Sequence, residues 1–417
     1  MNESDVMELR KRFKKDTSIS RMAGCYVDSN KQKVLKLNEV FLNLEADEFY
    51  KFLEIAKKTL GGTPGNNILE LDYERDQEAP GGRQQFLMGL RESNLTNEDL
   101  LDRLYDLVIE NYSYVGNYLI LVFHDTYDIM KRTSDNNKLD ESEEVYDYLL
   151  VSVCPVELSK AGLGYREDEH RIGARVRDWV VGVPEIGFLF PAFNDHSADI
   201  HKVDYFIKDP KDSHAEFAEG VLGCGSKRTN TEKREAFKSI VKKVFSDSED
   251  KAEDVFADIQ ESFSVRVNAG EDEEEFAAPI VLDDAVMDEI LVENGIEGDE
   301  ARNIKEVVKT EFEDEMPTLD VLLDEKLVRA NAKEKEKKEL VKEVCALKEE
   351  IKKNEEEKAE IAEVTTKSDL AEFEVILSVK PEKTDSIRTE MIDGKKCIVI
   401  PMSENEHVKI NGVRTEL

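Results

Sequence analysis

The stretch NYLILVFH at residues 117–124 has a core of consecutive apolar side chains, which predicts a buried β-strand. A second apolar run at residues 146–154 predicts another buried strand. Pro155 should end that strand, because proline has no N–H group to give to a sheet. Strands that alternate with helices across roughly the first half of the chain favour a mixed α/β or α+β domain. We expect the second, an α+β fold with mixed sheets and flanking helices.

Turn and helix signals place further elements on either side of this stretch. Short apolar runs at residues 21–28 and 33–44 flank turn residues, which predicts a hairpin. Apolar residues at helical spacing predict a helix at residues 45–60, ended by Gly61 and Gly62. The remaining predictions are a strand at 67–73, helices at 84–92 and from 96 or 97 to about 112, an apolar segment at 186–193, and a strand followed by helices over 202–263.

The last third of the chain passes from charged helical patterning to β patterning. Residues 333–363 are dominated by Lys and Glu, and an apolar seam with the spacing of coiled-coil a and d positions covers less than two heptads. The seam residues are Leu340, Val344, Leu347 and Ile351. Alternating residues from Phe373 to Val379 predict a strand. The dipeptides Asp393-Gly394 and Asn411-Gly412 each predict a tight hairpin turn.

These patterns divide the chain into five parts. The predicted parts are an α+β domain with a Gly-Gly loop (1–130), a second α+β region (131–268), an acidic linker (269–278), a charged helical segment (279–367) and a small C-terminal β-domain (368–417).

Composition excludes several classes of function. The 417 residues carry a formal net charge of −35, so broad binding to nucleic acid or to an anionic membrane would be repulsive. Neither a secretory signal nor a membrane span is visible, and the five cysteines are scattered without a CxxC pair. We therefore expect a reduced, cytoplasmic protein. No P-loop and no complete dinucleotide fingerprint is present, so we expect no nucleotide cofactor.

Four distinctive strings carry a resemblance to a known family. They are ISRMAGCYVD (19–28), CPVELSK (154–160), GFLFPAFND (187–195) and MIDGKKCIVIP (391–401). Over most of its length the chain resembles a family of uncharacterised proteins from Gram-positive bacteria, known only as a domain of unknown function. This resemblance implies no activity, substrate or catalytic residue.

The loop Gly81-Gly82-Arg83-Gln84-Gln85 suggests a specific chemistry. Two glycines allow close approach of the backbone to a ligand, and the Gln84 amide is able to orient a water molecule. Residues 20–125 resemble the catalytic middle domain of eukaryotic and archaeal peptide-release factors, which implies hydrolysis of peptidyl-tRNA by Gln84 in a loop shaped by Gly81 and Gly82. Arg83 departs from the family pattern, in which glutamine directly follows the two glycines. The alternative is a glycine turn that caps a helix.

Two basic groups are candidate RNA contacts for such a factor. The candidates are Arg10 and Arg12 near the start, and Arg171, Arg175 and Arg177 beside Trp179. The second group could equally pair internally with Asp168, Glu169 and Asp178, which lie close in sequence.

Histidines and cysteines offer weaker signals. His196, His201 and the pair His124-Asp125 could bind a divalent metal, but His196 and His201 are five residues apart and match no ligand signature, so local hydrogen bonds are the simpler interpretation. Whether the three histidines converge is left open. Cys154 is interpreted as a buried structural residue.

Three functional hypotheses follow from these signals. The first is a translation-associated factor that acts on or senses peptidyl-tRNA at the ribosome. The second is a non-catalytic interaction or regulatory protein that binds a protein partner through residues 333–417. The third is a metal-dependent hydrolase.

Overall fold

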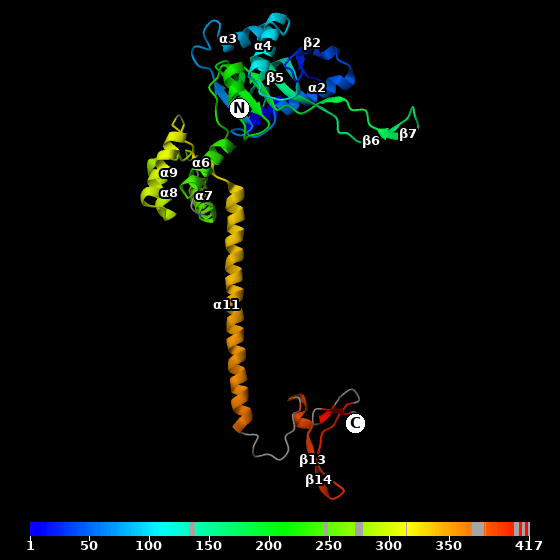
Figure 1. Cartoon of the computed structure of the whole chain (residues 1–417), viewed down its shortest axis with the longest axis vertical. Helices are drawn as coiled ribbons and strands as arrows, with labels where there is room; N and C mark the ends of the chain where they lie inside the picture. Colours follow the sequence, from blue (N-terminus) through cyan, green and yellow to red (C-terminus); the bar gives the residue numbers. More distant parts are fainter. Residues whose placement is uncertain are drawn as a thin grey trace. The chain divides into compact units, whose positions relative to one another are not determined.

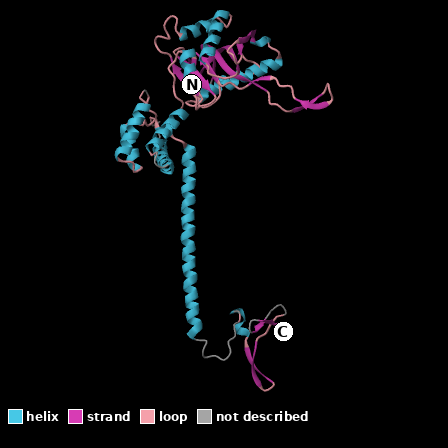
Figure 2. Cartoon of the chain, in the orientation of Figure 1, coloured by secondary structure: helices cyan, strands magenta, loops and turns pink. Residues whose placement is uncertain are grey.

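The computed structural model describes residues 1–132, 138–245, 249–271, 278–313, 315–368, 379, 381–403, 408–410 and 413–415. The chain divides into two compact units, residues 1–331 and 332–417. Figure 1 shows the elements along the chain, and Figure 2 shows that the first unit combines a sheet with helices. Among the described helices, none is both long and apolar enough to cross a membrane.

An eight-stranded antiparallel sheet is the centre of the first unit. Its strand order is β2-β1-β4-β5-β9-β12-β3, with β8 paired to the end of β5. The strands are β1 (Arg21–Val27), β2 (Lys33–Val40), β3 (Ile68–Asp72), β4 (Asn117–Arg132), β5 (Lys138–Leu158), β8 (Trp179–Val181), β9 (Ile186–Phe190) and β12 (Lys202–Ile207). The prediction of an α+β fold is confirmed, with antiparallel pairing throughout this sheet.

The apolar run at residues 117–124 lies in β4 near the middle of the sheet and faces two cores. Ile120 and Val122 pack with helices α3 (Arg83–Glu92) and α4 (Glu98–Asn111) on one face. Leu121 and Phe123 pack with helices α1 (Glu3–Arg12) and α2 (Ala46–Thr59) on the other. Helices on both faces explain why this strand has no polar side.

The prediction that Pro155 ends its strand is wrong. β5 continues through Pro155 to Leu158. On that side of β5, β9 pairs only as far as Val153 and β8 begins to pair at Val156, so Pro155 faces the gap between them. Its carbonyl accepts a hydrogen bond from Gly182 N (2.7 Å), and an N–H group is not required there.

A hairpin projects from the sheet between β5 and β8 (Figure 1). It consists of β6 (Leu163–Arg166) and β7 (Arg171–Ala174). We call residues 159–178 the arm. A second small hairpin joins β10 (Ala192–Asn194) to β11 (Ser197–Asp199).

Helices after the sheet build a separate apolar core. They are α6 (Asn230–Val244), α7 (Glu249–Glu271), α8 (Asp284–Glu293), α9 (Gly298–Glu311) and α10 (Leu319–Leu322). Before them in the chain come α5 (Ala215–Phe217) and a π-turn at Ala218–Leu222, which pack with the core of the sheet. The sheet takes strands from both predicted ranges 1–130 and 131–268. Helix α7 extends into the predicted acidic linker as far as Glu271, and residues 272–277 lie outside the described part.

The second unit contains most of helix α11 (Glu325–Ser368) and two strand pairs. β13 (Arg388–Ile392) and β14 (Lys395–Val399) are joined by Asp393 and Gly394, both with positive φ, as the Asp-Gly signal predicts. β15 (Val408–Ile410) pairs with β16 (Val413–Thr415), while the predicted turn residues Asn411 and Gly412 lie outside the described residues. So do residues 373–378 of the predicted strand.

Candidate functional site

The Gly-Gly loop is anchored in the sheet unit. Gly81 has a φ of 94°, and Gly82 is the N-cap of α3. A Cβ on Gly82 would lie 2.2 Å from Gln77 O, so glycine is required by close packing of the loop on itself. The N–H of Gln84 donates to the same carbonyl (3.2 Å), which fixes the start of the helix.

The Gln84 side chain is buried, and both ends of its amide are hydrogen-bonded. It is 4% exposed, its Nε2 donates to Ile200 O (3.1 Å), and its Oε1 accepts from Gln85 Nε2 (2.7 Å). Orienting a water molecule would require an amide with free hydrogen-bonding capacity in contact with solvent. This geometry corresponds to the alternative interpretation, a turn that begins a helix.

The three histidines bind different carboxylates. His196 Nδ1 lies 2.8 Å from Glu8 Oε2, and His201 Nδ1 lies 2.7 Å from Glu78 Oε1. The hydrogen bond to the Glu78 carboxylate raises the pKa of His201. Over the part of the chain that the structure describes, no group of three or more His, Cys, Asp or Glu side chains is placed to hold a metal ion.

His124 belongs to a polar cluster that sequence reasoning missed, formed by Ser20 just before β1, His124 in β4 and Asp147 in β5. Ser20 Oγ lies 2.6 Å from His124 Nδ1. His124 Nε2 lies 2.8 Å from Asp147 Oδ1, but these two atoms are not aligned for a hydrogen bond. His124 is buried, whereas Ser20 is exposed. The Ser20 N–H donates to His124 O (2.9 Å). No local motif could have revealed this cluster, because Ser20 and His124 are 104 residues apart.

The buried cysteines are structural. Burial raises the pKa of the Cys25 thiol to about 11 and that of Cys154 to about 12. Neither is a thiolate near neutral pH, so neither is an activated nucleophile.

Arg12 is engaged within the fold. Its guanidinium donates to Thr126 O (3.0 Å), pairs with Asp125 (3.6 Å) and lies 4.0 Å from the centre of the Tyr127 ring. RNA binding by Arg10 and Arg12 stays a prediction.

The other candidate arginines lie on the arm, in a hairpin and not on a helix. Arg166 and Arg171 both pair with Glu169, as the alternative of internal pairing anticipated. Arg177 Nε donates to Ser159 O (2.7 Å). Arg175 makes no ion pair with any described residue. RNA binding by Arg171, Arg175 and Arg177 stays a prediction.

One face of the arm is apolar and exposed. In the β6–β7 register Leu163 is opposite Ala174, and Tyr165 is opposite Ile172, so all four side chains point to the same face. Leu163, Tyr165 and Ile172 are 78%, 60% and 63% exposed. The opposite face carries Gly164, Gly173, Arg166 and Arg171. The alternation of residues 163–166 is the sequence signal that could have identified this face.

A groove lies between helix α2 and the face of the sheet on which α2 packs. It has a volume of about 1040 Å³ and is lined by apolar residues including Leu37, Phe52, Ile55 and Val180–Val183 with Gly182. Five carboxylates and two lysines also line it. They are Glu39, Glu45, Asp47, Glu48, Glu54, Lys51 and Lys58. Both lysines pair with Glu54. The other four carboxylates make no ion pair with any residue that the structure describes.

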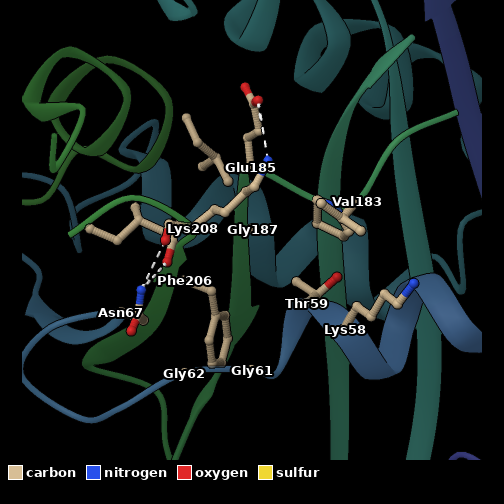
Figure 3. Close-up of a pocket in the computed structure, with 13 residues that line it drawn as sticks. Lys58, Thr59, Gly61, Gly62, Asn67, Val183, Glu185, Gly187, Phe206 and Lys208 are labelled. Atoms are coloured by element: carbon tan, nitrogen blue, oxygen red, sulfur yellow. Dashed lines mark hydrogen bonds and ion pairs between the residues drawn. The ribbon is translucent and has the colours of Figure 1, made fainter. Parts of the chain in front are cut away.

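A smaller cavity of about 380 Å³ lies at the C-terminal end of α2 (Figure 3). Polar groups that line it are hydrogen-bonded within the fold. Asn67 Nδ2 donates to Ile207 O and Lys208 O, each at 3.1 Å, and Thr59 Oγ1 lies 2.6 Å from Ser152 Oγ, which is outside the lining. A Cβ on Gly187 would lie 2.3 Å from Thr59 Cγ2. The cavity therefore marks where α2 packs closely on the sheet.

Helix α11 carries a second exposed apolar surface. Leu340, Val344, Leu347 and Ile351 are each about half exposed, at 48% to 57%. The predicted a/d seam is therefore uncovered in the described residues.

Comparison with protein-family models identifies a family that covers nearly the whole chain. The model of a family described as a domain of unknown function (DUF4317) matches residues 1–413. No curated protein matches the chain. The resemblance of residues 20–125 to release factors is not shown by these comparisons.

Proposed function

The chain belongs to the DUF4317 family, and we propose that it is a protein-interaction protein that binds its partner through the arm. The observation that carries this proposal is the exposed apolar face of the β6–β7 hairpin. Each of its strands has four residues.

An isolated two-stranded hairpin is only marginally stable in water, so burial against a partner would be expected to stabilise it. Soluble proteins rarely expose contiguous apolar patches without a use for them. Fully burying a Leu or Ile side chain contributes roughly 1.5–3 kcal/mol. Burial of Leu163, Tyr165 and Ile172 together would therefore contribute several kcal/mol to the stability of a complex.

The seam of α11 independently supports a protein-interaction function, through a surface other than the arm. An apolar stripe at coiled-coil spacing on a charged helix is a typical binding surface for another helix. It lies in the range 333–417 that the sequence suggested as a partner-binding region.

We place this function in the cytoplasm. Support comes from the cysteines, which are all free: Cys25, Cys154, Cys224, Cys345 and Cys397.

The single tryptophan provides a direct test, because Trp179 lies where the arm joins β8 and is 56% exposed. Protein labelled with 5-fluorotryptophan gives one ¹⁹F resonance, which can be followed in extract of the source cells. We expect that resonance to shift and broaden when the protein is concentrated or placed in extract, and the variant L163E/Y165E/I172E to keep the resonance of the dilute isolated protein. A resonance that changes neither with protein concentration nor on addition of extract would contradict the proposal.

Ser20, His124 and Asp147 favour a second candidate function, hydrolysis of an activated acyl ester. Ser20 Oγ would attack the acyl carbon while His124 Nδ1 takes the hydroxyl proton and then returns it to the leaving alkoxide. Water would then release the acyl group from Ser20, with His124 again as the base. The 2.6 Å contact between Ser20 Oγ and His124 Nδ1 supports this candidate.

A fluorophosphonate probe tests it. We expect labelling of the full chain that is lost in Ser20→Ala and strongly reduced in His124→Gln. Ser18→Ala is the matched control, since Ser18 is an exposed neighbour whose hydroxyl contacts Arg12 instead of a histidine. An unlabelled wild-type protein would exclude this candidate.

A further inference from the structure

We infer that the partner of the arm is a second copy of this chain, and that the arm of each copy lies in the groove between α2 and the sheet of the other. This inference rests on the proposed interaction function of the arm.

Charge is the first reason. The chain carries a formal charge of −35, so two copies repel each other unless a basic element meets an acidic one. The end of the arm that returns to the sheet is such an element. Val176 lies between Arg175 and Arg177. Among the described residues, Arg175 has no ion-pair partner, and the Arg177 guanidinium donates only to the backbone carbonyls of Leu158 and Ser159.

The groove has the complementary charge. Glu39, Glu45, Asp47 and Glu48 are exposed, and none of them forms an ion pair within the described chain. Asp47 and Glu48 lie in the first turn of α2, where the helix dipole favours negative charge. An arriving guanidinium would meet unpaired carboxylates and would not have to displace a cation.

Apolar surface is the second reason. The groove presents Leu37, Phe52 and Ile55 to solvent, and its volume of about 1040 Å³ is at the upper end of the range for ligand sites. Val176 is 71% exposed on the arm, between the two arginines. Val176 between two arginines is therefore complementary to the groove, whose apolar side chains lie beside carboxylates.

The position of the groove on the chain is the third reason. Val180, Val181 and Val183 form part of its wall, and they follow directly after the arm. In each copy, the arm and the groove that would receive the partner's arm are therefore adjacent. A two-fold axis beside this region would place each arm at the groove of the other copy, and the contact would occur twice in a closed dimer.

Sedimentation velocity of the full chain tests the inference. We expect a dimer whose dissociation constant rises at least tenfold in R175E/R177E and at least tenfold in E45K/E48K. Combining the two sets should restore most of the affinity, because each reversed arginine again meets an opposite charge. Lys14→Glu with Lys15→Glu is the matched control, since these exposed lysines lie outside the arm and the groove, and the dimer should persist.

Other results would overturn it. A dimer that is unaffected by R175E/R177E but lost in L340E/L347E would assign self-association to α11. A wild-type chain that stays monomeric at all concentrations, while its ¹⁹F resonance shifts in extract, would exclude the second copy and leave the proposed interaction function standing. A monomer whose resonance is also unchanged in extract would remove both proposals.

Discussion

The Gly-Gly loop and the arm are two loop regions with glycine and arginine in their sequences, and they differ in what their side chains contact. Gln84 in the first is 4% exposed and has both ends of its amide in hydrogen bonds. Tyr165 and Ile172 in the second are 60% and 63% exposed and share an apolar face that no described element covers. Side chains that form buried hydrogen bonds, such as Gln84, stabilise the fold. Apolar side chains that are exposed to solvent, as on the arm, are available to bind a partner.

The largest expected effect concerns Asp204, a buried carboxyl in the same sheet unit as the loop. Burial raises the pKa of Asp204 from 3.8 to about 7, although the N-terminal amine opposes this. Between these values the folded state binds more protons than the unfolded state, so stability falls as pH rises from about 4 to about 7.

Asp204→Asn should remove that dependence, because the Asn Oδ1 is still able to accept from Phe193 N as Asp204 Oδ2 does at 2.7 Å. From pH 5 to pH 8 we expect the wild type to lose roughly 2–3 kcal/mol more than the variant in urea unfolding. Equal losses in the two proteins would show that Asp204 is ionised at both pH values.

Gly82→Ala should destabilise the fold by about 2 kcal/mol, because the new Cβ would lie 2.2 Å from Gln77 O. Gly162→Ala on the arm is the matched control, since a Cβ there has no neighbour within 4 Å. Thermal and urea unfolding of the pair measure the difference. If both variants were equally stable, the loop would not be packed as described.

Gln84→Ala should cost about 1–3 kcal/mol of stability, because Ile200 O loses its buried donor. Gln32→Ala, at an exposed glutamine, should change stability by less than about 0.5 kcal/mol. The release-factor hypothesis predicts instead a loss of peptidyl-tRNA hydrolysis at unchanged stability. Ester hydrolysis and urea unfolding, measured on the same variant, separate the two.

The smallest expected effect on stability is on the arm itself. Tyr165→Ser with Ile172→Ser should shift the free energy of unfolding of the sheet unit by under about 0.5 kcal/mol, because both side chains are already in water. A cooperative loss of stability of several kcal/mol, measured in dilute protein, would mean that the arm is part of the core and not a binding surface.

Local sequence patterns correctly predicted the turns and helix starts that depend only on neighbouring residues. Asp393-Gly394 predicts its hairpin because both residues accept positive φ, and Asn97 predicts the start of α4 because its side chain accepts from Asp99 N and Leu100 N. Such signals require no knowledge of the rest of the chain.

Long-range contacts decided what the sequence left open. Gln84 donates a hydrogen bond to Ile200, which is 116 residues away, and no local pattern could have indicated this contact. Pro155 is tolerated in β5 only because β9 ends before it and β8 begins after it. The apolar face of the arm follows from the β6–β7 register, which depends on where the chain turns between Arg166 and Arg171.

The environment of Trp179 as a function of protein concentration tests the central claim most directly. Its fluorescence comes from one residue at the junction of the arm and β8. We predict that its emission moves to shorter wavelength as the wild-type protein is concentrated, and that R175E/R177E keeps the emission of an exposed indole at every concentration. Emission that does not change with concentration in either protein would contradict the docking of the arm on a second copy.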